Sequence, residues 1–260
     1  MTVVPDLLRL SLATDDERAL LERLGSRLTV VNAANDEAER RYSGSWVAQQ
    51  FGISIPPRMQ NLHTVAGWCG SVVDILEERL DWLGWASEGD DYGLAQVYAD
   101  NGLDVDSGMA HLDSLIFGVS FVSVGSGFDG EPSPLVTPHA PTEMTGSWDR
   151  RTRRLSAAAT FVRGEGGDIV EATLYTPFST ATFTKRQGLW ATVERDDHRL
   201  GRLPVVAIPN RVRGSREMGR SEITKAVRYY ADAAARTLLG LEVNREFYNA
   251  PQRIGLNVKD

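Results

Sequence analysis

The longest helical pattern in this chain lies near its end, at residues 221–249. Apolar side chains recur there at steps of three, four and seven residues, at Ile223, Val227, Tyr230, Ala234, Leu238, Leu241 and Tyr248. Further apolar residues widen this face, namely Ala231, Ala233, Ala235, Leu239 and Val243. A helix that is apolar on more than one side needs more than one neighbour. The pattern therefore fits either the central helix of a helical domain or a helix that packs beside copies of itself.

The ends of this helix are indicated by capping and breaking residues. Ser221 is the expected N-cap, and Glu222 falls in the first turn, where the helix dipole favours negative charge. Pro251 is expected to end the helix, because the residue before a proline is driven out of the helical region. The expected length is about 43 Å, at roughly 1.5 Å per residue.

The rest of the chain predicts an α+β fold. Helices are expected at residues 14–44, 61–83, 94–101 and 106–117. Short strands are expected at residues 119–124, 155–162, 169–175, 181–185, 189–194 and 203–208, within a β-rich region that begins at residue 132. The second helix carries apolar residues at helical spacing, and these are expected to pack in the core: Val65, Trp68, Val72, Leu76, Leu80 and Leu83.

Composition and charge restrict the possible functions. The net charge is −7, which argues against a protein that binds duplex DNA by neutralising phosphates. The charge is uneven, because residues 1–210 carry 18 basic and 29 acidic residues, whereas residues 211–260 carry 10 and 6. Cys69 is the only cysteine, so no internal disulfide is expected, which fits a reducing cytoplasm. No apolar stretch reaches the ~18 residues of a membrane span, and the N-terminus does not have the pattern of a signal peptide.

Motifs that could carry chemistry are weak. The G-x-G-x-x-G pattern at residues 125–130 is followed by Pro132 and Pro134 rather than by a helix, so we interpret it as a hairpin loop. Asp104 and Asp106 resemble the start of a calcium loop but are better explained as a helix N-terminus. The histidines are widely spaced, there is no P-loop and no nucleophile elbow, and Cys69 is expected to be buried. The sequence thus predicts no catalytic, cofactor-binding or metal-binding residues, and no enzyme.

Several short motifs, in order along most of the chain, resemble those of tailed-bacteriophage portal proteins. The strongest are the Gly-Arg-Ser start at Gly219, the Ala-Arg-Thr-Leu centre at residues 235–238 and the Ala-Pro-Gln-Arg end at residues 250–253. Weaker matches are Asn61, Val72-Val73-Asp74, Glu78-Arg79-Leu80, Gly84-Trp85, Asn101, Leu103-Asp104, His111-Leu112-Asp113, and Trp148-Asp149 with Arg153-Arg154.

The resemblance implies a division of the chain. Residues 1–59 would be an N-terminal helical segment and residues 60–210 an α+β wing-like domain. Residues 211–250 would form a linker and a long stem-like helix, and residues 251–260 the start of a clip-like strand. Portal proteins continue beyond this point, so the chain is expected to be an N-terminal portion of a longer protein or a natural remnant.

The resemblance also implies a function. The chain would be a non-enzymatic subunit of a dodecameric ring at the capsid vertex, through which double-stranded DNA is packaged and ejected and at which head and tail are joined. Expected partners are other copies of the chain, the large terminase subunit, the scaffold and major capsid proteins, and head-completion or adaptor proteins, with no membrane and no cofactor. The protein would be assembled in the host cytoplasm and reside in the virion.

Candidate residues for subunit contacts or for the DNA channel lie in the last fifth of the chain. They are Arg211, Arg213, Arg216, Arg220, Lys225, Arg228, Asp232, Arg236, Glu242 and Arg245. The four arginines at the start of this set form either a solvated linker or a cluster that pairs with carboxylates of a neighbouring subunit or with DNA phosphate. The net negative charge of residues 1–210 belongs either to an ordinary acidic surface or to a channel wall that DNA slides past without binding.

One alternative from another functional class stays open. An α+β enzyme or small-molecule-binding protein would assemble a dispersed site from Asp74, Glu78, His111 and Asp113. Such a protein would be a monomer or a small oligomer with a pocket, whereas a portal protein would be a self-associating ring.

Overall fold

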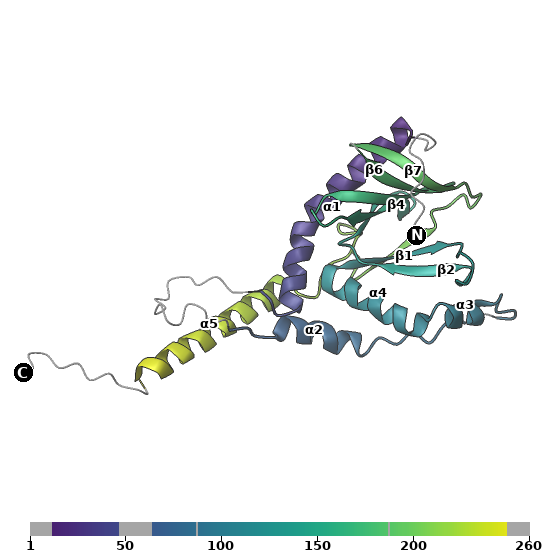
Figure 1. Ribbon diagram of the computed structural model, residues 1–260. Coiled ribbons are helices and arrows are strands. Elements are labelled where there is room, and N and C mark those ends of the chain that lie inside the picture. Colours follow the sequence, from purple (N-terminus) through teal and green to yellow (C-terminus); the bar gives the residue numbers. More distant parts are fainter. Residues whose placement is uncertain (1–11, 47–63, 87, 187, 249–260) are drawn as a thin grey trace, which may run out of the picture.

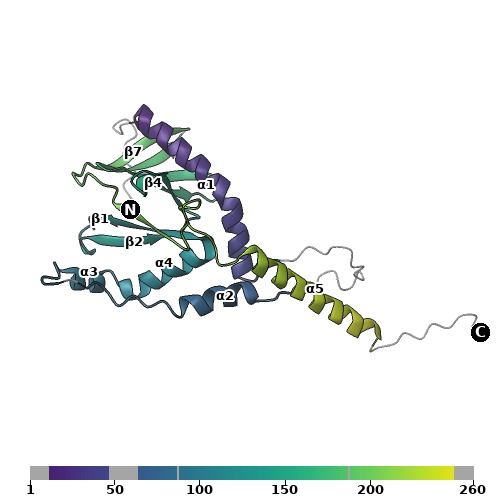
Figure 2. The ribbon, with the colours of Figure 1, turned by 180° about the vertical axis from the view of Figure 1, so that it is seen from behind.

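The computed structural model describes residues 12–46, 64–86, 88–186 and 188–248. These residues form two antiparallel sheets and four helices that pack together as one body, and a fifth helix that projects away from it (Figures 1 and 2). The predicted α+β class, with a helical N-terminal part and a long C-terminal helix, is confirmed.

Helix α1 (Asp15–Tyr42) runs along the whole body. It begins with a capping box, in which the Glu17 N–H donates to Thr14 Oγ1 (3.3 Å) and the Thr14 N–H donates to Glu17 Oε2 (2.9 Å). The helix ends at Ser43, followed by Gly44 with a φ of 73°. The helix predicted at residues 14–44 is therefore confirmed. Its N-terminal half packs in one hydrophobic core and its C-terminal half in another.

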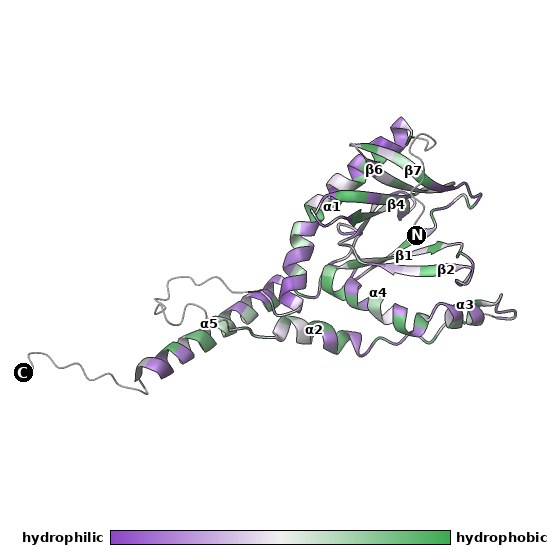
Figure 3. Ribbon diagram, viewed as in Figure 1, coloured by the Kyte–Doolittle hydropathy of each residue, from purple (hydrophilic) through white to green (hydrophobic). Residues whose placement is uncertain are grey.

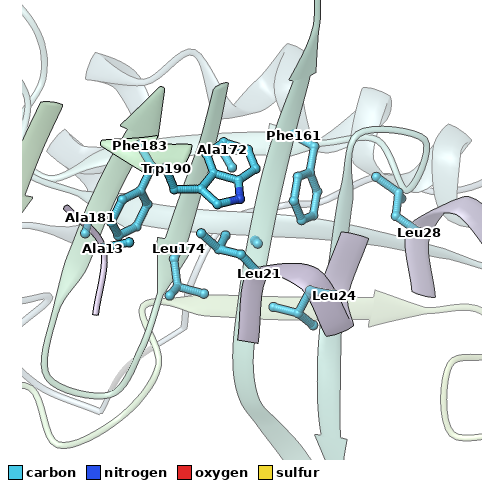
Figure 4. Close-up of a cluster of buried hydrophobic side chains, with 11 residues drawn as sticks. Ala13, Leu21, Leu24, Leu28, Phe161, Ala172, Leu174, Ala181, Phe183 and Trp190 are labelled. Atoms are coloured by element: carbon cyan, nitrogen blue, oxygen red, sulfur yellow. The ribbon is translucent and has the colours of Figure 1, made fainter. Parts of the chain in front are cut away.

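The N-terminal half of α1 covers a five-stranded antiparallel sheet. Its strands are β3 (Met144–Asp149), β4 (Arg154–Arg163), β5 (Ile169–Tyr175), β6 (Thr180–Arg186) and β7 (Leu189–Asp196), in this spatial order. Leu21, Leu24 and Leu28 point from α1 onto the sheet, where Phe161 and Phe183 are among their neighbours (Figure 4). All five of these side chains are at most 3% exposed. The leucine spacing of three and four residues thus places one stripe of α1 over a pleated apolar face.

A second, three-stranded antiparallel sheet has the order β2-β1-β8. Its strands are β1 (Val119–Gly125), β2 (Leu135–His139) and β8 (Val205–Pro209). One face packs against β3 and β4 of the larger sheet, with Phe121, Met144, Leu155, Ala158 and Val205 buried between them. Strands β2 and β3 were not resolved as separate strands by the sequence pattern, whereas the loop at residues 125–130 does connect two hairpin strands as expected.

The helix predicted at residues 61–83 is wrong in extent. Helix α2 covers only Trp68–Glu77, and residues 61–63 lie outside the described residues. Trp68 and Leu83, predicted to be core residues, are 53% and 90% exposed, whereas Val73 is fully buried. Beyond the helix, Trp82 and Trp85 pack edge to face with each other (4.8 Å between ring centroids), and both also contact the ring of Tyr98.

Helices α3 (Leu94–Asp100) and α4 (Leu103–Phe117) follow. Helix α4 begins three residues earlier than predicted, because Gly102 takes a φ of 59° and allows the chain to turn directly into Leu103. Asp104 and Asp106 lie in its first turn, as the helix-start interpretation predicted. Gly118, with a φ of 101°, ends α4 and starts β1.

Helix α5 (Lys225–Tyr248) is the projecting helix, and its predicted start at Ser221 is wrong. Ser221 Oγ instead accepts the N–H of Ile223 (3.0 Å), and Thr224 Oγ1 takes the capping position by accepting the N–H of Val227 (3.4 Å). The expected stop at Pro251 lies outside the described residues. Among the helices that the structure describes, none is long and apolar enough to cross a membrane.

We predict that Leu28→Ala lowers the free energy of unfolding by about 2–5 kcal/mol, because it leaves a cavity under α1. Val30→Ala on the same helix is the control, since Val30 is 77% exposed and its change should stay within about 0.5 kcal/mol. Urea unfolding followed by circular dichroism measures both. Equal losses in the two variants would contradict the placement of this core.

Candidate functional site: the α5 root

The place where α5 leaves the body is built from segments distant in sequence, and we call it the α5 root. It consists of residues 210–232 and of the parts of α1, α2 and α4 that contact them. Figure 1 shows α1, α2 and α5 converging there, and α4 ends close by. A shared apolar cluster lies beneath it, formed by Ala38, Cys69, Val73, Leu115, Ile116, Ile223 and Ala231.

Two glycines allow the chain to cross itself in the α5 root. The Asn210 N–H donates to the Gly118 carbonyl, and the Arg220 N–H donates to the Asn210 carbonyl, each at 2.8 Å. A Cβ on Gly118 would lie 2.8 Å from Arg220 Cα, and one on Gly219 would lie 2.3 Å from the Gly118 carbonyl oxygen. Both glycines also have positive φ, 101° and 65°. Only glycine fits these positions, since a side chain would be both strained and in collision.

Glu222 fixes the segment just before α5. Its main-chain N–H donates to the Leu115 carbonyl (2.9 Å), and its Oε1 accepts a hydrogen bond from Asn210 Nδ2 (2.8 Å). The same oxygen forms an ion pair with Arg211. Burial would raise the pKa of Glu222, but the hydrogen bonds from Asn210 and Arg211 and the nearby positive charge outweigh it and hold the pKa below its ordinary value. Glu222 is therefore an ionised anchor.

A four-charge network joins α1 to α5. Arg41 Nε contacts Glu37 Oε1 (2.8 Å), and its Nη1 and Nη2 bind the two oxygens of Asp232 at 3.1 and 3.3 Å. Arg228 Nη1 adds a second contact to Glu37 Oε1 (3.2 Å). The Arg41 side chain is only 7% exposed, and its guanidinium carbon lies 4.2 Å from the centroid of a Trp46 ring. Burial alone would lower the pKa of Arg41, but the bonds to Asp232 and Glu37 raise it, so the group stays charged.

Neighbouring polar contacts complete the α5 root. Thr64 Oγ1 donates to the Ala235 carbonyl of α5 (2.8 Å), so the segment before α2 is also tied to the helix. The Tyr42 hydroxyl donates to Asp74 Oδ1 (2.9 Å), and burial together with this carboxylate raises the pKa of Tyr42 to about 12. Burial also raises the pKa of the Cys69 thiol, so it remains protonated and apolar at neutral pH. The predicted burial of Cys69 is confirmed.

The sequence-derived candidates fall into two groups. Arg211, Arg228 and Asp232 take their partners from within the same chain, and Arg228 Nε also donates to the Ile223 carbonyl (2.9 Å). Among the described residues, the remaining seven form no ion pair within the α5 root, and they differ in exposure. Arg213, Arg216, Arg220 and Lys225 are exposed, Arg236 is half-buried, and Arg245 is an exposed partner of Glu242 at 3.5 Å. Arg213 and Arg216 share a tight turn through their main chains.

Sequence reasoning missed Glu37, Arg41, Trp46 and Asn210 as members of this site. The spacing of Glu37 and Arg41, four residues apart, is a signal for a local pair on one helix face. Nothing in the sequence shows that the same guanidinium meets Asp232, which lies 191 residues away. Glu222 was interpreted only as a first-turn acid of the helix, whereas it acts before the helix begins.

The four residues of the alternative dispersed site lie in different surroundings. Asp74 is engaged by Tyr42, and Glu78 is exposed at the end of α2. His111 lines a hollow between α4 and the three-stranded sheet. Burial, then the charges of Glu39 and Glu143, raise the pKa of Asp113 to about 6. Within the described residues, no group of three or more His, Cys, Asp or Glu side chains is placed to hold a metal ion.

Comparison with known proteins bears on this arrangement. Residues 36–257 match the family described as phage portal protein, SPP1 Gp6-like. The portal proteins of Mycobacterium phage L5 and Mycobacterium phage D29 are each 34% identical over 240 residues. These alignments cover 88% of this chain and 48% of each relative. The chain therefore spans about half the length of the curated relatives it matches.

We predict that Arg41→Met costs about 3–5 kcal/mol of folding stability, because it leaves the carboxylates of Glu37 and Asp232 without their shared cation. Arg40→Met, on the adjacent and exposed position, should cost less than about 1 kcal/mol. Chemical unfolding of the two variants gives the comparison. A loss for Arg41→Met no larger than that for Arg40→Met would show that the network does not hold α5 to the body.

We also predict a pH signature from Glu222. Because the folded-state pKa is lowered, its stabilisation is present above the ordinary glutamate pKa of about 4.3 and is lost as pH falls through the folded value. Glu222→Gln should therefore lower the melting temperature at pH 7, and the difference from the unmodified chain should shrink towards pH 3. Glu22→Gln on the exposed side of α1 serves as the control. A difference that is constant with pH would count against an ionised anchor.

Proposed function

This chain belongs to the family of phage portal proteins described as SPP1 Gp6-like, and from this membership we propose that it forms part of a ring-shaped channel at one vertex of a capsid. DNA would pass through the ring during packaging and ejection, and the same ring would join head to tail. Portal proteins are structural proteins, so we propose a passive, non-enzymatic role.

The observation that carries this proposal is the projecting helix. Within the described residues, α5 leaves the body, and hydrophobic and hydrophilic residues alternate along its ribbon (Figure 3). Tyr229, Tyr230, Leu238 and Leu241 are 63%, 61%, 45% and 58% exposed. Uncovered apolar area of this kind on a single helix marks a contact surface. Other copies of the same helix, arranged around a ring, would cover it.

The proposed parts follow the division expected from sequence. Residues 60–210 would form the wing-like domain and residues 211–250 the linker and stem-like helix, with residues 251–260 leading into a clip-like strand. Helix α1, in the N-terminal segment 1–59, shares a core with the five-stranded sheet, so we propose that it moves with the wing. The α5 root would then fix the angle between wing and stem.

We propose partners by function. The ring would contact the large terminase subunit, which hydrolyses ATP, as well as scaffold, major capsid and head-completion or adaptor proteins. Double-stranded DNA would be guided rather than bound. Within residues 1–210, acidic residues outnumber basic ones. This supports the proposal, because like charge raises the energy of close contact with phosphate.

Electron microscopy of negatively stained particles tests the ring. The samples are this chain and the longest product of its reading frame, each at several protein and salt concentrations. Closed particles with a central hole from either sample would support the proposal. Monomers under every condition for the longest product would overturn it.

We predict that Arg236→Glu weakens self-association more than it weakens folding, because Arg236 lies midway along α5, where neighbouring helices would meet. Light scattering after size-exclusion chromatography measures the assembly, and circular dichroism measures the fold. Arg23→Glu, an exposed position on α1, is the charge-matched control. Unchanged rings from Arg236→Glu would place that part of α5 away from the subunit contact.

A further inference from the structure

A large hollow lies on the body at the open side of the three-stranded sheet, away from α5. Its volume is roughly 760 Å³, and it is open to solvent. Its walls come from the β3–β4 hairpin, from the segment that precedes β8, and from β8 itself. We call it the β8 hollow. None of the ten interface or channel candidates lines it.

Positive charge dominates the β8 hollow. The arginines in its lining are Arg153, Arg154 and Arg202, all exposed, and none of them makes an ion pair with another described residue. The one acid in the lining, Asp149, is occupied by its own turn, where it accepts bonds from the Arg151 N–H (2.9 Å) and Thr152 Oγ1 (2.8 Å). Three unpaired guanidinium groups thus gather in one recess of a chain whose net charge is −7.

The hollow also exposes an unpaired strand edge. Strand β8 ends the order β2-β1-β8, so no described strand pairs with its other side. The β1–β8 ladder is framed by the bonds Val124 N–H to Pro204 carbonyl and Asn210 N–H to Gly118 carbonyl. Main-chain groups of an antiparallel strand alternate between its two sides. Counting from Pro204, the N–H and carbonyl of Val205 and Ala207 therefore face away from β1.

Apolar side chains complete the recess. Trp148 and Leu203 line it, and Trp148 Nε1 is buried with no hydrogen-bond partner among the described residues. Val206 is 61% exposed, on the opposite face of β8 from the buried Val205. The hollow therefore offers main-chain donors and acceptors along one line, guanidinium groups near that line, and apolar surface between them.

We propose that the β8 hollow binds an extended acidic segment of a partner polypeptide, which adds to the open edge of β8 as a further strand. Strand addition of this kind draws affinity from main-chain hydrogen bonds, and the side chains that alternate along the added strand give specificity. Aspartate or glutamate at alternate positions meets Arg153, Arg154 and Arg202, whose planar guanidinium groups suit carboxylates. Apolar residues at the positions between them point to the other face of the added strand, on the side of Val206.

A polypeptide fits these features better than DNA does. A phosphate backbone pairs with arginines but offers no alternating N–H and carbonyl groups to a strand edge. The surrounding chain is acidic, which opposes a long duplex more than a short peptide that reaches only the recess. Strand pairing and charge pairing together therefore select an acidic peptide.

The test uses a fluorescein-labelled peptide of about ten residues in which Glu and Val alternate, measured by fluorescence anisotropy with the whole chain. We expect saturable binding that Arg154→Glu/Arg202→Glu weakens by about tenfold or more. The control, Arg23→Glu/Arg27→Glu, changes the net charge equally at exposed positions of α1 and should leave binding unchanged. Circular dichroism confirms that both variants are folded.

Two further probes separate strand pairing from charge pairing. The peptide is also made with N-methyl groups on every Val or on every Glu, because only one of these sets can point its N–H groups at β8. One of the two methylated peptides should lose binding, and if neither does, strand addition is wrong. A duplex of about 20 base pairs is the third probe. If the duplex binds with the same arginine dependence while the peptide does not bind, the hollow is a phosphate site and the proposal is overturned.

Discussion

The buried guanidinium of Arg41 is the interaction on which the arrangement of this protein depends. It is held by a carboxylate of its own helix, by a carboxylate of α5 and by the face of Trp46. A charge taken out of water needs all of its partners, because its solvation is lost whether or not they are present. The network therefore favours one relative position of α1 and α5 over others in which Arg41 would be buried and unpaired. Apolar packing in the cluster beneath it supplies attraction but less directional preference.

The second fixed point is the crossing at Gly118 and Gly219, with Glu222 beside it. The main-chain bond from Glu222 to Leu115 of α4 holds the segment just before α5, and the ion pairs of Arg228 and Asp232 to α1 hold its first turns. A helix held over its first turns and uncovered beyond them transmits the orientation of the body to its far end. In a ring of subunits, that orientation would set how neighbouring stems meet. The Gly-Arg-Ser-Glu stretch is thus explained by the geometry of an attachment rather than by the helix it precedes.

The two sheets have different roles in this picture. The five-stranded sheet has one face buried under α1. In the three-stranded sheet, no strand of the described part of the chain pairs with the outer edge of β8, and this edge opens into the arginine-lined hollow. Unpaired strand edges invite pairing with other chains, and proteins usually shield or charge them. Here three arginines without an ion-pair partner among the described residues lie next to the edge, and the one acid in the lining, Asp149, is bonded within its own turn. We therefore propose that the edge is selective for acidic chains.

The sequence by itself determined the elements whose signals are local. The leucine spacing and capping residues of α1, the alternation of β4 to β7 and the stop at Gly118 each depend on neighbours a few residues away, and so the α+β class and most element positions were predictable. The portal motifs, read in order, gave the family. The tertiary structure alone decided where α2 ends and where α5 begins, because Trp82 and Trp85 pack on Tyr98 of α3 and Glu222 is bound by Asn210 and Leu115. It alone brought Arg41 to Asp232 and three arginines to the edge of β8. These contacts join residues far apart in the chain, and local periodicity carries no information about which distant surfaces come together.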